Sequence, residues 1–402
     1  MNTPNSLLRH THGGHAAVGY AELFFDLVYV FAVTQLSHFI LKHPDVNGVL
    51  AGAVLFLTVW WAWVWMTWST NWLDPERGIV RLLIFLVMLA GLVMGAAIPK
   101  AFGAAGFVFV VAAVGTQIVR TAFVAWAVRE NRANSRNLTR ATLWMVASLP
   151  LWIAGALSGP EARMAFWAVA VGMNLLAPFA GFWVPVLGAS RTTDFGVSGG
   201  HMAERCALFI IIALGEGIIV TGATFADLEW TGTVVAAFVT AFTGTVAMWW
   251  IYFDRGARRG SEHIEHHQDS GRIARDAYTY LHIPIVAGIV ATAVGDEMLL
   301  AHPLGHVEPL FVFGAVGGPA QFLAGVGAFK WRTGSTPFFP MSHLFGLGML
   351  ALIALWALFG HPSPLAVGIA VVVALIVVAV WEWRSFHGGW SDKPVPKRRA
   401  KA

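Results

Sequence analysis

Residues 47–68 read NGVLAGAVLFLTVWWAWVWMTW and contain no charged side chain. A hydrocarbon core of about 30 Å is crossed by about 20 residues of α-helix, so this stretch is long and apolar enough to span a membrane. The whole chain has the same character, because 57% of its 402 residues are hydrophobic and only 12% are charged. Soluble domains carry about 25% charged residues. The sequence therefore predicts an all-α, polytopic membrane protein.

This composition excludes a soluble enzyme, a DNA-binding module and a secreted disulfide scaffold. The single cysteine, Cys206, permits no disulfide within the chain. The net charge of +4 is interpreted as a topology signal and not as nucleic-acid binding. The expected surroundings are therefore a lipid bilayer.

Twelve stretches satisfy the length and polarity of a membrane helix. They are residues 19–41, 47–68, 78–98, 103–128, 139–158, 162–186, 201–222, 231–253, 276–300, 308–330, 341–360 and 363–383.

Lysines and arginines are distributed unequally between the two sides of these spans. Of the 26 basic residues, 22 fall on the side that holds both termini. Lys42, Lys100 and Arg163 fall on the other side, and Arg120 lies inside a span. Because cytoplasmic loops are enriched in lysine and arginine, the N-terminus and the C-terminus are both predicted to be cytoplasmic.

The two halves of the chain resemble each other weakly. Ala21-Glu22 corresponds to Ala203-Glu204, Trp60-Trp61 to Trp249-Trp250, and Gln117 to Gln321. Six spans per half give a parallel repeat, with any pathway expected between the halves. Chance matching among apolar helices is the alternative interpretation. The expected divisions are a polar N-terminus (1–18), a first half (19–186), a linker (187–200), a second half (201–383) and a basic tail (384–402).

Several motifs resemble the bacterial low temperature requirement A (LtrA) family. They are ELFFDLVYVF at 22–31, TQLSH at 34–38, the Trp-rich TWSTNWLDPE at 67–76, AER at 203–205, IALGE at 212–216 and YTYLHIP at 278–284. The resemblance covers essentially the whole chain, and Gly217 departs from the serine expected after Gly-Glu. It implies a multi-pass protein of the bacterial inner membrane that is linked to growth in the cold, and it implies no known biochemical activity.

Ionisable residues inside a bilayer are costly unless they are paired or hydrated. Glu22 and Asp26 share one helix face because they are four residues apart, and Arg120 lies roughly 12 Å from the cytoplasmic end of its span. We predict a buried contact between Asp26 and Arg120, with Glu22 and Arg81 as further candidates. The cytoplasmic helix ends also carry Arg81, Glu204, Arg205, Asp276 and His282.

Two interpretations of this polar layer remain open at the level of sequence. It is a site for a proton, an ion or a substrate, or it is a set of ion pairs that fixes helix packing. The candidate site residues are Glu22, Asp26, Arg81, Arg120, Glu204 and His282, together with Glu216.

Glu216 lies about fifteen residues into its span, roughly 20 Å from the cytoplasmic end. Gly215 and Gly217 flank it and leave its backbone free to depart from regular helix. A carboxylate at this depth predicts a proton or cation site. A neutral carboxylic acid that only fixes helix packing is the alternative.

Trp61, Trp65, Trp68 and Trp72 form one helical stripe about 16 Å long. An aromatic belt at the membrane interface is one interpretation. The other is the lining of a pathway, or an aromatic box for a cation or a lipid headgroup.

The loop SEHIEHH at 261–267 places His263 and His267 four residues apart, with His266 beside them. This spacing suits a shared metal ion if the loop is helical, but a solvated surface is the more common outcome. No HExxH, P-loop or GxSxG motif is present, so the familiar hydrolase and ATP-driven functions lack their motifs, and the sequence leaves any cofactor unknown.

These features favour a secondary transporter or channel over an enzyme. Its cargo is expected to be an unidentified small solute or ion, linked to protons or another cation. The alternative is a membrane-embedded, lipid-handling protein or enzyme that acts on a phospholipid or an isoprenoid. A structural or sensory protein without flux is a third class.

The distribution of basic residues gives a direct test of topology. A reporter fused after Ala402 is expected to be active only when it is of the type that works in the cytoplasm. Activity of a periplasm-specific reporter at the same position would show that the orientation is wrong.

Overall fold

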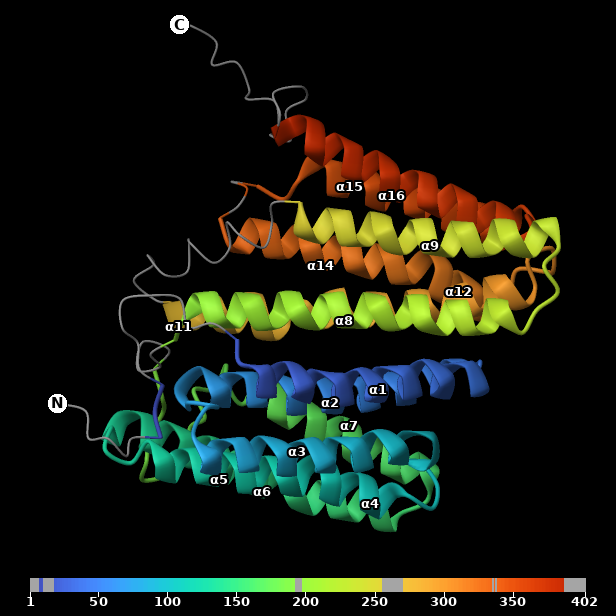
Figure 1. Ribbon diagram of the computed structural model, residues 1–402. Coiled ribbons are helices and arrows are strands. Elements are labelled where there is room, and N and C mark those ends of the chain that lie inside the picture. Colours follow the sequence, from blue (N-terminus) through green and yellow to red (C-terminus); the bar gives the residue numbers. More distant parts are fainter. Residues whose placement is uncertain are drawn as a thin grey trace, which may run out of the picture. The chain divides into compact units, whose positions relative to one another are not determined.

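The computed structural model describes residues 7–9, 18–191, 197–254, 270–334, 336 and 338–386 (Figure 1). Helices dominate these ranges, which contain no β-strand. Strand-like pairing within them is limited to single bridges, from Leu8 to Leu73 and from Val184 to Gly188. The predicted all-α fold is confirmed.

Eleven helices in the described ranges have the length and apolar composition needed to cross a membrane. A twelfth apolar helix, α7 (Pro160–Leu176), has 17 residues, and its length is about 26 Å. The prediction of about twelve spans is therefore confirmed.

The first six spans occupy the chain up to residue 176. They are α1 (Tyr20–Lys42), α2 (Val46–Trp72), α3 (Gly78–Ala97) with the short turn η1 (Ile98–Lys100), a composite of α4 (Gly106–Val110), η2 (Val111–Gly115) and α5 (Thr116–Ala127), α6 (Arg132–Leu157) and α7.

The last six spans follow from residue 199. They are α8 (Gly199–Ala226), α9 (Gly232–Phe253), a composite of α11 (Ser270–Ala274), η4 (Arg275–Tyr280) and α12 (His282–Ala301), a composite of α13 (Pro309–Val312), η5 (Phe313–Gly317) and α14 (Gly318–Arg332), α15 (Met341–Phe359) and α16 (Pro364–Phe386).

Packing divides the chain into two compact units. Unit 1 comprises Met1–Ile212 and Glu265–Arg275, and unit 2 comprises Ala213–Ile264 and Asp276–Ala402. The division falls inside α8, so the first half of this helix belongs to unit 1 and the second half to unit 2. The sequence placed a linker at 187–200, before this helix.

Local sequence sets where several helices begin. The Asp45 carboxylate accepts a hydrogen bond of 2.6 Å from Gly48 N at the start of α2, and the Thr231 hydroxyl accepts one of 3.3 Å from Val234 N at the start of α9. Such side chains satisfy amides that the helix itself leaves without partners. Proline occupies the first turn of α7, α13 and α16, where a missing N–H costs nothing.

The sixth span is shorter than the predicted residues 162–186. The helix ends at Leu176, and Pro178 follows two residues later, where it cannot continue the hydrogen-bond pattern. Gly181 and Phe182 then adopt positive φ angles of 59° and 49°, which turn the chain away from the helix axis.

Arg163, on the side with few basic residues, is held by main-chain oxygens. Its guanidinium donates hydrogen bonds of 2.7–3.1 Å to the carbonyl groups of Gly155, Ala156, Ser158, Ala101 and Gly103. Free carbonyl groups at helix ends and in turns are natural acceptors for such a donor. Arg163 therefore joins the loop after α3 to the end of α6.

Backbone contact between α12 and the α13–η5–α14 composite is unusually close. A Cβ added at Gly295 would lie 2.3 Å from Ala315 N, and one added at Gly318 would lie 2.5 Å from Thr292 N. Small residues at these positions let two membrane helices approach each other directly. This contact therefore depends on glycine.

Gly295→Ala is expected to lower the free energy of unfolding by about 1–3 kcal/mol, because the new methyl group overpacks the interface. Gly348→Ala is the matched control, since a Cβ at Gly348 meets nothing within 4 Å. Thermal unfolding of the purified variants in detergent measures the difference. Equal midpoints for the two variants would contradict the close packing.

Candidate functional site

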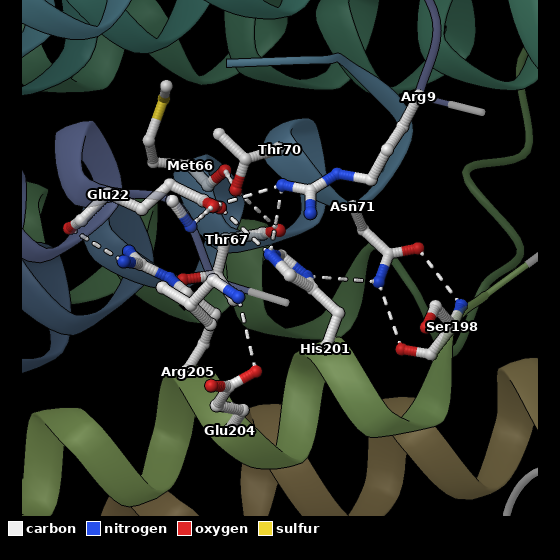
Figure 2. A network of polar contacts seen from close by, with 12 residues as sticks. Arg9, Glu22, Met66, Thr67, Thr70, Asn71, Ser198, His201, Glu204 and Arg205 are labelled. Atoms are coloured by element: carbon white, nitrogen blue, oxygen red, sulfur yellow. Dashed lines mark hydrogen bonds and ion pairs between the residues drawn. The ribbon is translucent and has the colours of Figure 1, made fainter. Parts of the chain in front are cut away.

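Two acidic side chains of α1, Glu22 and Asp26, face two side chains of α8 inside unit 1. Figure 2 shows Glu22 with its neighbours His201, Arg205 and Arg9. The Nε2 atom of His201 lies 2.8 Å from Glu22 Oε1. One turn along both helices, Arg205 donates to Asp26 with Nη2–Oδ1 and Nη1–Oδ2 distances of 2.8 and 3.0 Å. Both pairs join residues 179 positions apart in the chain. They form two successive rungs between the helices.

Glu22 accepts hydrogen bonds on both carboxylate oxygens and is fully buried. Besides His201, it accepts from Arg9 Nη2 at 3.0 Å and from Gly19 N at 2.8 Å, both on Oε2. The bond to Gly19 N caps the start of α1. Glu22 therefore joins the N-terminal segment, α1 and α8 through one side chain.

Asp26 lies in a fully enclosed environment. It accepts 2.8 Å from the Trp63 indole N–H in addition to the two bonds from Arg205. Arg205 also donates to the main-chain oxygen of Glu22 at 2.7 Å. A buried carboxylate and guanidinium compensate each other's charge only with such close hydrogen bonding.

Asn71 determines which nitrogen of His201 carries the proton. Its amide is oriented by Ser198, because Asn71 Nδ2 donates to Ser198 O at 3.0 Å and Ser198 N donates to Asn71 Oδ1 at 3.1 Å. Asn71 Nδ2 also lies 3.3 Å from His201 Nδ1, so Nδ1 must be the acceptor. This contact favours a neutral His201 with its proton on Nε2, directed at Glu22 at 2.8 Å, while Arg9 Nη2 lies farther from the same nitrogen, at 3.4 Å.

The segment of residues 7–9 is fixed against the end of α2. Leu8 pairs with Leu73, and Arg9 N donates 2.9 Å to Trp72 O. This contact brings the Arg9 guanidinium, which is 11% exposed, over Glu22. With His201 neutral, the formal charges of Arg9, Glu22, Asp26 and Arg205 cancel.

The predicted contact between Asp26 and Arg120 is wrong. Arg120 is buried, but it donates to Ala62 O at 3.3 Å and to the Thr121 hydroxyl at 2.9 Å, and its guanidinium lies 5.8 Å from the ring centre of Trp65. Within the described residues no carboxylate pairs with it. Depth along a helix does not give the direction in which a side chain points.

Two other candidates lie at the margin of the network. Arg81 forms an exposed ion pair of 2.8 Å with Glu76 and does not reach Glu22. Glu204 is half-buried and accepts 3.2 Å from Val18 N (Figure 2). The structure thus brings Glu22, Asp26 and Glu204 together.

Glu216 and His282 lie in unit 2. Glu216 is half-buried, and α8 continues as regular helix through Gly215 and Gly217. His282 is buried, with Nε2 2.8 Å from the Tyr252 hydroxyl and Nδ1 2.8 Å from Ala277 O. Asp276, at a helix end, pairs with Arg332 at 2.7 Å.

The tryptophan stripe of α2 runs from the protein interior toward the helix end. Trp61 and Trp65 are 5% and 8% exposed, whereas Trp68 and Trp72 are half-buried. Trp61 also lines a small enclosed cavity of unit 1, which has room for about one water molecule. Polar groups on that cavity wall come from Thr58, Gln117 and Asn174.

The weak metal candidates His263 and His267 lie outside the described residues. Among the residues that are described, no group of three or more histidine, cysteine or acidic side chains is placed to hold a metal ion.

His201 and Arg9 were missed by the analysis of the sequence. A usable signal existed for His201, because His201 and Arg205 repeat the four-residue spacing of Glu22 and Asp26 at the matching ends of their spans. Arg9 had no such signal, since it precedes the first helix.

Replacing Arg205 with alanine is expected to lower the free energy of unfolding by about 3–5 kcal/mol, because Asp26 would remain buried without its partner. Adding Asp26→Asn is expected to recover part of that loss. Chemical or thermal unfolding in detergent measures all four members of the cycle.

The control cycle combines Asp26→Asn with Arg120→Ala. These two losses are expected to add within about 0.5 kcal/mol, since the residues share no contact. Additivity in the Arg205 cycle, or strong coupling in the Arg120 cycle, would contradict the assignment of partners.

Comparison with known proteins agrees with the motifs. The sequence model described as "Bacterial low temperature requirement A protein (LtrA)" matches residues 17–380. The "Uncharacterized protein RA0937" of Rhizobium meliloti (strain 1021) is 40% identical over 381 residues, which cover 94% of this chain and 91% of the relative. No solved structure matches the chain. The chain therefore belongs to the bacterial low temperature requirement A (LtrA) family.

Proposed function

We propose that this membrane protein is a proton-linked secondary transporter of the bacterial inner membrane, with both termini in the cytoplasm. The observation that carries the proposal is the buried Glu22–His201 pair, a carboxylate and a neutral imidazole in direct contact. Ionisable groups inside membrane proteins commonly mark proton relays and ion pathways. The excess of basic residues on one side supports the orientation.

Protonation of His201 would reorganise its neighbours. A second proton at Nδ1 would face the amide hydrogens of Asn71, and two donors repel each other. The Asn71 amide would have to rotate and would lose both bonds to Ser198. Proton uptake is thereby linked to the end of α2 and to the chain that leads into α8.

Arg120 is our candidate for contact with the solute. It is a fully buried cation with no carboxylate partner in the described residues, and its Nε atom makes no hydrogen bond. Gln117, one turn earlier on α5, lines the small cavity of unit 1. This arrangement favours a small solute with an anionic group, because a planar guanidinium binds carboxylates and phosphates well.

The parallel six-plus-six repeat remains part of the proposal. Within unit 1, the composite α4–η2–α5 packs against α3 and α6, α6 packs against α7, and α7 packs against α2. Within unit 2, α14 packs against α12 and α15, α15 packs against α16, and α16 packs against α9, which is the same order of neighbours. The turns η2 and η5 are both π-helical and follow the first turn of corresponding spans. These similarities support a duplication.

A lipid-handling role is the second candidate. It is favoured by an apolar groove of about 250 Å³ in unit 2, between α9 and α16. Trp250 and Trp383 line this groove and are each more than 40% exposed. Tryptophan at such positions is typical of contact with lipid headgroups.

Proteoliposomes that contain a trapped pH-sensitive dye test transport directly. A gradient of a small carboxylate, phosphate or sulfate is expected to acidify or alkalinise the interior through the wild-type protein. Glu22→Gln is expected to reduce this flux to the level of empty liposomes. The substitution replaces the charged carboxylate that faces His201 Nε2 with a neutral amide. Glu76→Gln, which changes an exposed acid, is the matched control.

The same assay includes Glu216→Gln. Loss of flux with normal membrane expression would assign Glu216 to the coupling mechanism, and full activity would leave only a structural role. Wild-type protein that moves none of these solutes but scrambles a fluorescent phospholipid would replace transport with the lipid-handling function.

A further inference from the structure

The small enclosed cavity of unit 1 lies where four of its helices meet. Thr58 of α2, Gln117 of α5 and Asn174 of α7 give it a polar lining, and Trp152 of α6 forms another part of its wall. These helices pack against one another, since α5 and α7 each contact both α2 and α6. The cavity has room for about one water molecule.

Trp152 brings to this cavity a hydrogen-bond donor that has no partner in the part of the chain that the structure describes. Its side chain is 2% exposed, and its indole Nε1 makes no hydrogen bond there. Buried N–H groups without an acceptor are rare in folded proteins. Trp167, whose ring packs beside that of Trp152, has the usual arrangement, because its Nε1 donates to Trp152 O at 3.1 Å. The cavity is where an acceptor for Trp152 Nε1 can lie.

Gln117 supplies an acceptor whose orientation is fixed by the main chain. Its Nε2 donates 3.1 Å to Ala113 O, in the π-helical turn η2. Because a carbonyl group can only accept, the amide nitrogen lies on that side and Oε1 on the other. Gln117 is 6% exposed, and none of the described residues donates to its Oε1.

Asn174 supplies a second acceptor, which Ser148 orients. The Ser148 hydroxyl donates to Met145 O at 2.8 Å, so it can only accept from the Asn174 amide 3.3 Å away. The donor in that contact is therefore Asn174 Nδ2, which leaves Oδ1 as an acceptor. Among the residues described, no side chain or amide donates to this oxygen.

We propose that this cavity is a binding site for one water molecule, which accepts from Trp152 Nε1 and donates to Gln117 Oε1 and Asn174 Oδ1. Three hydrogen bonds are the usual number for a buried water molecule. A metal cation or an ammonium ion does not suit the site, because neither can accept from the indole N–H. The bound water joins α5, α6 and α7 inside unit 1.

The water also fixes the side chain of Gln117 next to Arg120. These two residues are three positions apart on α5 and so lie on the same side of the helix. The proposal does not depend on transport, because it concerns the interior of unit 1 whether or not a solute moves.

Nuclear Overhauser contacts between indole protons and water test the site directly. The full-length protein is labelled with ¹⁵N at its tryptophan indoles in deuterated detergent, and Trp152→Phe identifies the Trp152 signal. A rotating-frame experiment separates dipolar contact with water from proton exchange. The Trp152 Nε1 proton is expected to show such a contact. Trp167 is the internal control and is expected to show none, because its buried Nε1 proton already has a carbonyl partner.

Val171→Ile is expected to abolish the contact, because Val171 lines the cavity and one added methyl group occupies the space of the water. Val124→Ile is the matched control, since Val124 is equally enclosed but does not line the cavity. Thr58→Val is expected to retain the contact. This variant removes the one hydroxyl group of the cavity wall, whose exchanging proton could imitate water.

A wild-type protein without a water contact at Trp152 would overturn the proposal and leave a dry cavity. Loss of the contact in Thr58→Val would overturn it too, because the signal would then come from the hydroxyl group. A contact that survives in Val171→Ile would place the water outside this cavity and would also contradict the site. If Val171→Ile does not fold, the wild type and Thr58→Val still decide the question.

Discussion

The requirement that buried charges be compensated inside the hydrocarbon region fixes the geometry of unit 1. Glu22 and Asp26 occupy two turns of α1, and His201 and Arg205 occupy the facing turns of α8. A shift of one turn would place Asp26 against His201 and leave Arg205 without a carboxylate. The two rungs therefore set the register and rotation of these helices, and Asn71 and Arg9 are arranged around them.

Different parts of the chain satisfy the same requirement by different chemistry. Arg163 is bound by five carbonyl oxygens and no acid, which is possible where helix ends leave acceptors free. Lys330 combines one carboxylate with one carbonyl group. Arg120 has only a carbonyl, a hydroxyl and an aromatic ring within its reach. The three cations thus range from fully to poorly compensated.

The sequence was sufficient for the fold because membrane helices are recognised by length and polarity alone. The sequence was less informative where the end of a helix depends on local turns, as at Leu176. It was also less informative about ion-pair partners, as for Asp26, which pairs with Arg205 and not with Arg120. Depth along a helix follows from residue spacing, but pairing also depends on helix rotation, which apolar spans with little amphipathicity do not reveal. Arg9 illustrates a further limit. Its position depends on a β-bridge between Leu8 and Leu73, and no periodic pattern in the sequence predicts that bridge.

The distance of 179 residues between the partners of each rung has a consequence for biosynthesis. At about 5–20 residues per second, a ribosome needs about 10–35 s to extend the chain from Glu22 to His201. During that interval α1 carries two acids whose basic partners on α8 do not yet exist. The first helix is therefore expected to stay near the insertion machinery or the lipid headgroups during this interval. It would reach its final position in the bilayer only after α8 has been synthesised.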